Sequence, residues 1–219
     1  MKNYQTIEFQ IKGHFAFVNL NRPEVRNAFN DILISEFHEI LDELTTNKHE
    51  LRGMILQGNG KIFSAGADIN WMKTTINYSN DKNREDGKKL YELFEKIHKL
   101  PLPVITLVHG ASIGGANGLV AASDIVLAES ETHFRFSEVK IGLVPATIAP
   151  FVIQRTKNQA AKYYMLTGSK FTGEDALRIG LVDSTGNKES IETKLELLIK
   201  EFQKNSPEAV RETKKLVNK

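Results

Sequence analysis

The stretch that decides the fold covers residues 103–145 and reads PVITLVHGASIGGANGLVAASDIVLAESETHFRFSEVKIGLVP. It begins at 104–108 with an uncharged, β-rich run, which is typical of a strand buried on both faces. The turn at 110–115 consists largely of glycine and small residues, which permit tight turning and close approach to the backbone. An apolar, alanine-rich run of helical length follows at 116–122. The stretch therefore predicts a strand, a glycine turn and a helix.

This glycine turn indicates a site for negative charge. The N-terminus of a helix presents unpaired N–H groups and a positive dipole end, which suit an anion or a developing oxyanion. A second strand is expected at 125–128, and beyond it Glu138 lies in an apolar neighbourhood with Phe134 and Phe136. We interpret the unit as a catalytic platform. In the alternative, the glycines only let helix and strand pack closely.

Residues 110–114 also match the G-x-S-x-G nucleophile elbow of serine hydrolases. Ser112 would then be the nucleophile, and the mechanism would need an acid and then a histidine later in the chain. His133 is the only histidine that follows Ser112. This chain order disfavours a hydrolase.

Length and composition indicate one domain with a substantial core. The 219 residues are 41% hydrophobic and 26% charged, and the formal charge of +2 gives no reason to expect a nucleic-acid partner. The absence of cysteine excludes disulfides, cysteine-based zinc sites and thiol catalysis. No signal-peptide core and no membrane-length apolar run are present, so we expect a cytoplasmic protein without a membrane segment. No pattern indicates a metal site.

The first part of the chain predicts a hairpin, a helix and a strand. Residues 6–20 alternate in two bursts, which is a β-hairpin pattern. Apolar residues recur at helical spacing over 28–44, with Asn27 as a candidate helix cap. A short strand is expected at 52–57.

A second glycine-rich turn follows at 63–69, FSAGADI. Its small residues leave backbone N–H groups uncovered, and Asp68 is a candidate cap for a helix that starts there. In the alternative, Asp68 serves only as this helix cap and takes no part in a site. The polar run at 76–86 predicts a loop, and 87–100 returns to helical spacing before the prolines at 101 and 103.

The rest of the chain predicts mainly helices. Thr172 is expected to cap a helix with Asp175 three residues on, and Ser206 to cap another. The other expected elements are helices at 158–167 and 190–202 and a strand at 181–183. Because strands and helices alternate, we predict an α/β domain with largely parallel strands. The two glycine turns would then each offer an N–H group, and two donors aimed at one point make an oxyanion hole.

Several motifs stand in a recognisable order along the chain. They are LNRP and Asn27-Ala28 within 20–28, FSAGADI at 63–69, the glycine turn and Asp124 within 103–124, Phe134 to Pro145 with Glu138, and Ala176 with GLVD at 180–183. With them, the chain resembles the crotonase superfamily of enoyl-CoA hydratases and isomerases over essentially its whole length.

The resemblance implies a spiral of ββα units, with a core domain at 1–189 and a shortened, apparently incomplete C-terminal helical region at 190–219. Family members usually continue through further helices, so we expect a truncated chain. The resemblance also implies a homotrimer or hexamer and an acyl-CoA thioester as partner. Because CoA is part of the substrate, no separate cofactor is expected.

The resemblance also implies residue roles. The thioester oxygen would lie between the N–H groups of Ala67 and Gly115, and Glu138 would transfer protons. Arg26 would meet the CoA phosphates, or else be a solvated loop cation. The full set of expected substrate- and CoA-binding residues is Arg26, Ala28, Ala65, Gly66, Asp68, Ile69, Gly114 and Gly118.

One position departs from the family pattern. Hydratases of this family usually carry two glutamates, and the first is expected four residues after Gly114, where this chain has Gly118. Glycine there, together with GADINWM at 66–72 and FSEVKIGLVPATI at 136–148, looks like bacterial 3-methylglutaconyl-CoA hydratases of leucine breakdown. Those substrates carry a distal carboxylate. We hypothesise that this carboxylate, or a residue of the loop at 76–86, orients the water in place of the missing glutamate.

Three functions remain open from the sequence. The favoured one is hydration of an enoyl-CoA, with 3-methylglutaconyl-CoA as substrate. The second is isomerisation of an enoyl-CoA by Glu138 alone. The third is a non-catalytic acyl-CoA-binding homologue. Arg135 is a candidate partner for the substrate carboxylate, although a structural role is favoured.

Overall fold

The computed structural model describes residues 2–47, 51–68, 70–72 and 78–218. The chain begins with an antiparallel hairpin of β1 (Ile7–Lys12) and β2 (Phe15–Leu20), in which Ile7 lies opposite Leu20. Gly13 makes the turn with a φ of 59°, in the left-handed region that glycine adopts readily. The predicted hairpin is confirmed.

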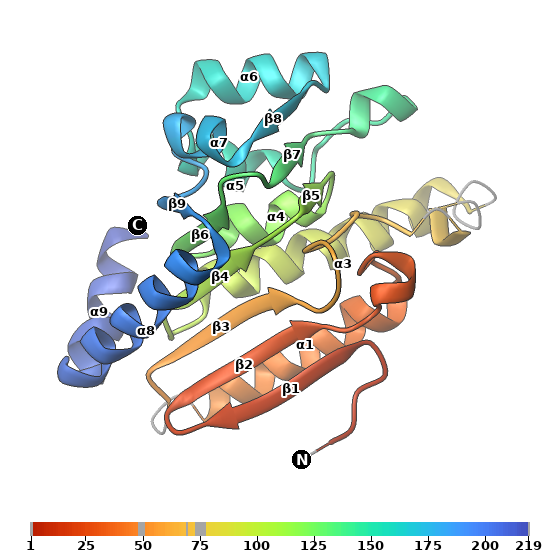
Figure 1. Cartoon of the computed structure of the whole chain (residues 1–219). Helices are drawn as coiled ribbons and strands as arrows, with labels where there is room; N and C mark the ends of the chain where they lie inside the picture. Colours follow the sequence, from red (N-terminus) through yellow and green to blue (C-terminus); the bar gives the residue numbers. More distant parts are fainter. Residues whose placement is uncertain (1, 48–50, 69, 73–77, 219) are drawn as a thin grey trace.

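A six-stranded sheet forms the centre of the molecule, with the order β1-β2-β3-β4-β6-β9 (Figure 1). Every neighbouring pair after the hairpin is parallel, as the sequence predicts. The additional strands are β3 (Gly53–Gly58), β4 (Val104–Val108), β6 (Ile125–Glu129) and β9 (Ser184–Gly186).

The predicted strand at 181–183 is wrong, because the last strand begins only at Ser184. The N–H groups of Leu181 and Val182 instead donate to the carbonyl of Ala176 and close the end of the preceding helix. Their apolar side chains are buried in the main core, which explains why a strand-like pattern appears in the sequence.

A second, three-stranded sheet has the order β5-β7-β8, with β5 (Ala111–Ile113), β7 (His133–Arg135) and β8 (Lys170–Thr172). The sequence predicted only a turn at 110–115, whereas its middle forms β5 and pairs in register with β7. A parallel bridge between Ser64 and Ser112 ties this small sheet to the segment that follows β3.

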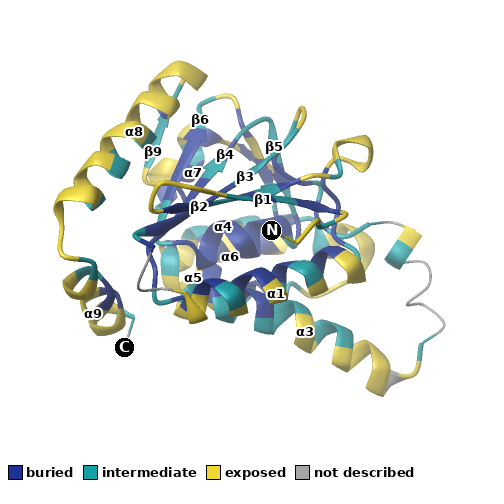
Figure 2. Ribbon diagram, turned by 90° about the horizontal axis from the view of Figure 1, so that it is seen from below, coloured by how far each residue is buried: buried dark blue, intermediate teal, exposed yellow. Residues whose placement is uncertain are grey.

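Helices α1 (Asp31–Thr46), α3 (Asn80–Lys99) and α4 (Ala116–Ala122) cover one face of the large sheet, and α8 (Lys188–Lys204) lies against the other (Figure 2). Side chains along β4 point alternately to the two faces of the sheet, so each face has apolar residues for a helical layer to cover. Val104 and Val108 belong to the main core with the first group of helices, whereas Ile105 packs in a smaller cluster with Ile191 of α8.

Two helix starts differ from the prediction. The first helix was expected at 28–44 with Asn27 as cap, but α1 begins at Asp31, and the Asn30 side chain accepts a hydrogen bond from the Leu33 N–H group. The third helix begins at Asn80, so residues 80–86 are helical rather than a loop. This exposed part of α3 buries no apolar stripe, and ion pairs such as Glu85–Lys89 accompany it. Residues 76 and 77 lie outside the described part.

Three of the remaining helices follow the predictions: α6 (Asn158–Thr167), α7 (Gly173–Ile179) and α9 (Pro207–Val217). Helix α5 (Ala149–Arg155) and two short 3₁₀ helices, η1 (Pro23–Val25) and η2 (Glu138–Ile141), were not predicted from the sequence. Thr172 and Asp175 form a reciprocal capping box, and Ser206 caps α9. Within the described ranges, no helix is long and apolar enough to cross a membrane.

Candidate active site

The first candidate donor, the Ala67 N–H group, lies at a short parallel bridge between Phe29 and Ala67. The Phe29 N–H group donates to the Gly66 carbonyl at 2.7 Å, and the Asp68 N–H group donates to the Phe29 carbonyl at 2.8 Å. In a trans peptide the N–H group points opposite to the C=O group. The bond on the Gly66 carbonyl therefore directs the Ala67 N–H group away from Phe29, and that N–H group makes no backbone hydrogen bond to the described residues.

The second candidate donor, the Gly115 N–H group, is fixed in the same way. Gly114 donates its own N–H group to the Arg135 carbonyl of β7 at 2.8 Å, and its carbonyl accepts from Asn117 at 3.0 Å. The Gly114 carbonyl is thus turned toward α4, and the Gly115 N–H group points the other way. It too makes no backbone hydrogen bond within the described ranges.

The two turns that carry these donors touch each other. A Cβ atom placed on Gly66 would lie 3.4 Å from the Gly115 nitrogen and would overlap the carbonyl oxygen of Ile113. Gly66 also has a φ of 81°, a conformation that side chains disfavour. Glycine at position 66 therefore lets the two N–H groups become neighbours, which is the arrangement that an oxyanion hole needs.

Glu138 is the first residue of η2 and lies beside the Gly114 turn. One of its carboxylate oxygens, Oε1, is 3.5 Å from the position of a Cβ atom on Gly114. The other, Oε2, is buried and has no hydrogen-bond partner in the described structure. Burial raises the pKa of Glu138, and a bond from its own backbone N–H group offsets this only in part. A carboxyl in this state is suited to proton transfer near neutral pH.

The structure explains why position 118 carries no acid. Gly118 is buried in α4, and a Cβ atom there would lie 2.5 Å from Cζ of Phe94. Phe94 of α3 is itself fully buried and meets Phe151 edge-to-face, with a centroid distance of 6.0 Å. The space that a second glutamate side chain would enter is therefore filled by an aromatic ring.

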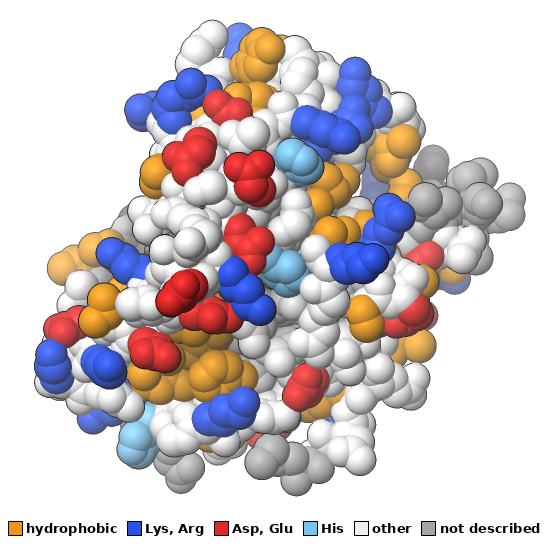
Figure 3. Space-filling model, viewed as in Figure 1, with side chains coloured by type: hydrophobic (Ala, Val, Ile, Leu, Met, Phe, Trp, Pro, Cys, Tyr) orange, Lys and Arg blue, Asp and Glu red, His pale blue; other side chains and the backbone are white. Residues whose placement is uncertain are grey.

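A groove of about 830 Å³ runs past the two turns and is lined by Ala65 and Ile113, which stand close to the candidate donors. Its charged lining consists of Arg26, Lys61, Lys170 and Glu24, and His133 lies among them. Lys, Arg and His side chains gather on this face around the small sheet (Figure 3). With three cationic side chains and one acid, the groove fits an anionic ligand. Glu138 does not line it.

The other expected binding residues are distributed around these turns. Ala65 donates its N–H group to the Arg26 carbonyl at 2.9 Å. The Ala28 carbonyl accepts a hydrogen bond from Arg22, and the Asp68 carboxylate accepts from the Asn70 N–H group, which is the predicted capping role. Ile69 lies outside the described residues.

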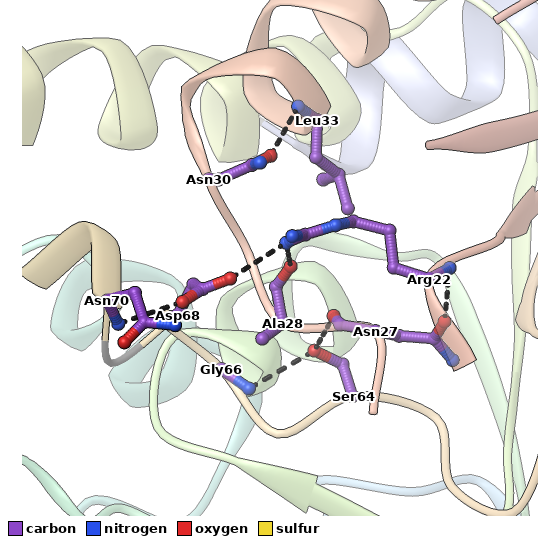
Figure 4. A network of polar contacts seen from close by, with 9 residues as sticks. All are labelled: Arg22, Asn27, Ala28, Asn30, Leu33, Ser64, Gly66, Asp68 and Asn70. Atoms are coloured by element: carbon purple, nitrogen blue, oxygen red, sulfur yellow. Dashed lines mark hydrogen bonds and ion pairs between the residues drawn. The ribbon is translucent and has the colours of Figure 1, made fainter. Parts of the chain in front are cut away.

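The sequence did not predict the polar network that joins the segment at 22–30 to the segment at 62–70 (Figure 4). Asn27 is fully buried, and its Nδ2 atom donates to the carbonyls of Asn59, Ile62 and Phe63. Ser64 donates its hydroxyl to the Asn27 carbonyl and accepts from the Gly66 N–H group. Arg22 and Asn27 lie in the motifs quoted above. Each has a hydrogen-bond partner more than 30 residues away in the chain, so no local pattern indicates these contacts.

The serine hydrolase alternative fails on geometry. Ser112 is fully buried and donates its hydroxyl to Oδ1 of Asn117 at 2.8 Å. His133 lies opposite Ala111 in the β5–β7 pairing, and it is exposed. Arg135 donates to the Gly168 carbonyl at 2.7 Å, which is a structural role. No cluster of three or more metal-binding side chains occurs among the described residues.

Comparison with known proteins gives the class to which this fold and site belong. Residues 10–219 match the enoyl-CoA hydratase/isomerase family, and the chain belongs to that family. It is 32% identical to a putative enoyl-CoA hydratase of Thermus thermophilus, covering 94% of this chain and 81% of that protein. It is 30% identical to the short-chain-enoyl-CoA hydratase of Clostridium acetobutylicum, covering 95% and 79%.

Solved structures agree with the fold. The structure of an enoyl-CoA hydratase from Shewanella pealeana matches with a TM-score of 0.93 and 35% identity, covering 97% of this chain and 79% of that one. The crotonase fold that the sequence motifs predict is therefore confirmed. The division at residue 189 and the roles of the individual site residues stay predictions.

Proposed function

We propose that this protein hydrates an enoyl-CoA thioester with Glu138 as its single acid–base residue, and that 3-methylglutaconyl-CoA is its substrate. The observation that carries the proposal is the Glu138 carboxyl, whose Oε1 atom stands beside the Gly114 turn and whose buried Oε2 atom has no hydrogen-bond partner in the described structure. A desolvated carboxyl beside two candidate amide donors is suited to moving protons at an enolate.

The reaction proceeds through an enolate. Glu138 accepts a proton from water while the water oxygen bonds to Cβ of the substrate. The electron pair of the double bond moves toward the thioester, whose oxygen becomes an oxyanion between the N–H groups of Ala67 and Gly115. Glu138 then returns the proton to Cα, so that one water is added overall. Each amide donor contributes about 3 kcal/mol if it behaves like other oxyanion-hole groups.

The proposed substrate compensates for the missing second acid. Phe94 fills the space above Gly118, so the chain itself supplies no glutamate there to hold the water. In 3-methylglutaconyl-CoA the distal carboxylate takes this role. The groove with Arg26, Lys61 and Lys170 binds the phosphates of CoA, which serves as part of the substrate and not as a separate cofactor. We propose a cytoplasmic homotrimer or hexamer as the working form.

The test is the fate of 3-methylglutaconyl-CoA with the purified protein, followed by mass spectrometry in ordinary and ¹⁸O-labelled water. We expect the gain of one labelled water, and little gain with crotonyl-CoA, which has no distal carboxylate. Glu138→Gln should lower kcat/KM by about 10²–10⁴-fold. Hydration that continues at the full rate in this variant would exclude the single-acid mechanism.

Isomerisation is the second candidate, and the Phe94–Gly118 packing favours it, because a double bond can be moved by one acid–base residue without water. Glu138 would remove a proton from one carbon and return it to another. An unchanged product mass in ordinary water, with deuterium incorporated from heavy water, would identify this reaction. Binding without either change would identify an acyl-CoA-binding protein.

A further inference from the structure

Arg22 links the two chain segments that hold the Ala67 N–H group. Its Nη1 atom donates to the Ala28 carbonyl at 2.6 Å and to Oδ2 of Asp68 at 3.1 Å (Figure 4). Ala28 comes directly before Phe29, and Asp68 comes directly after Ala67. The guanidinium therefore joins the two strands of the Phe29–Ala67 bridge immediately beside the bridge.

The ion pair is shielded from water. The Arg22 and Asp68 side chains are 16% and 12% exposed, so solvent screens their attraction less than that of a surface pair. Burial by itself raises the pKa of Asp68, but hydrogen bonds from Asn70 and Arg22 outweigh burial and lower the pKa below its ordinary value. Asp68 is thus ionised at neutral pH.

We propose that Arg22 is a positioning residue that aims the Ala67 N–H group at the thioester oxygen. The proposal rests on the proposed function, because it assigns that N–H group to an oxyanion hole. The Gly66–Ala67 peptide is oriented by the bond from the Phe29 N–H group, and Arg22 holds the residues on either side of that bond in place. Arg22 itself does not line the groove with the cationic side chains.

This arrangement separates catalysis from binding. A donor in an oxyanion hole affects the rate by about 10²–10³-fold, and small displacements of positioned groups are costly. CoA binding depends on the groove, whose cations are other residues. Arg22→Met should therefore lower kcat by about 10–100-fold and change the dissociation constant of CoA by less than about threefold.

A spectroscopic test reports on the oxyanion hole without turnover. Butyryl-CoA labelled with ¹³C at the carbonyl is saturated and does not react. Bound to the unaltered protein, its carbonyl stretch should shift to lower frequency, because the donors polarise the C=O bond. In Arg22→Met most of this shift should be lost. Arg22→Lys should keep part of it, because both bonds come from one nitrogen atom that an ammonium group can replace.

The controls separate the possible outcomes. Arg178→Met removes an exposed arginine that pairs with Asp175 on α7, and it should leave the carbonyl frequency and kcat unchanged. Asp68→Asn removes the negative charge that pairs with Arg22. It should reduce the carbonyl frequency shift as Arg22→Met does, but by a smaller amount. A full carbonyl shift in Arg22→Met with reduced thermal stability would overturn the positioning role. If the unaltered protein binds butyryl-CoA without any shift, the oxyanion hole itself is wrong.

Discussion

Glu138 makes the stability of the protein depend on pH in a direction that can be measured. Burial raises its pKa in the folded state above the ordinary value of 4.5. A raised pKa means that the stabilising contribution is fully present below the unfolded-state pKa and is lost as the pH rises through the folded-state pKa. At neutral pH the folded protein therefore carries the cost of a partly desolvated carboxylate, whose Oε2 atom is buried.

We accordingly expect Glu138→Gln to be more stable than the unaltered protein at pH 8, with the difference shrinking toward pH 4. Urea unfolding at the two pH values measures this. An equal free energy of unfolding at pH 8 would mean that the carboxylate is adequately solvated or paired. The same raised pKa places the acid limb of the pH–rate profile above the usual carboxyl range if Glu138 acts as a base.

The Phe94 ring occupies the space that a side chain on Gly118 would need. Gly118→Ala places a methyl group 2.5 Å from Cζ of the buried Phe94 ring, and such overpacking costs about 1–3 kcal/mol. Gly87→Ala is the control, because a Cβ atom there meets nothing within 4 Å and a helical alanine gains up to about 1 kcal/mol. Chemical denaturation of both variants tests the pair, and equal effects at the two sites would contradict it.

At the scale of elements, a buried lysine helps to hold the C-terminal helix α9 on the core. Nζ of Lys214 donates to the Leu102 carbonyl at 2.9 Å and to Oδ2 of Asp124 at 2.6 Å. Burial lowers the pKa of Lys214, and Asp124 partly offsets this. Asp124 also accepts from the Val104 N–H group, so the lysine reaches the start of β4.

Lys214→Met should weaken the attachment of α9 to the core. Removing the lysine leaves the Asp124 carboxylate, which is 24% exposed and keeps its bond from the Val104 N–H group. The cost should therefore be below the roughly 3–5 kcal/mol of breaking a fully buried ion pair. Hydrogen exchange of residues 207–217 should become faster in this variant. Lys215→Met removes the neighbouring, exposed lysine, which pairs with Glu212 on the surface, and should change little. Unchanged protection of α9 in Lys214→Met would show that other contacts, such as the bond from Asn218 to the His98 carbonyl, are enough to hold it.

Elements whose patterns report burial were predicted correctly from the sequence. β4 is uncharged, and β6 carries a charge only at its last residue, Glu129. Both lie between the two helical layers, and their buried residues alternate between the two apolar clusters. Elements held by a distant partner were missed or misplaced. β5 is only three residues long and exists because β7 pairs with it. The first turns of α3 are polar and exposed, so no apolar period marked them.

At the scale of the whole molecule, the candidate site is built from segments that are far apart in the chain. The sequence motifs contain Ala67, Gly115 and Glu138. The fold brings together the turns that carry these residues. No local pattern predicts that Phe94 covers Gly118 or that Arg22 reaches Asp68, because these contacts depend on how α3 packs on α4 and on how the segments at Arg22 and Asp68 meet. Long-range packing decides such details, and local pattern does not contain them.

The use of backbone amides as candidate donors has a consequence for how this protein tolerates mutation. A side-chain catalyst disappears with one ordinary substitution, whereas the N–H groups at 67 and 115 are lost only to proline. Selection against random change should therefore fall on the residues that orient the peptides. Gly66, whose Cβ atom would overlap the Ile113 carbonyl, and the buried Asn27 are such residues. We therefore expect the positions most sensitive to substitution to lie beside the reacting atoms without contacting them.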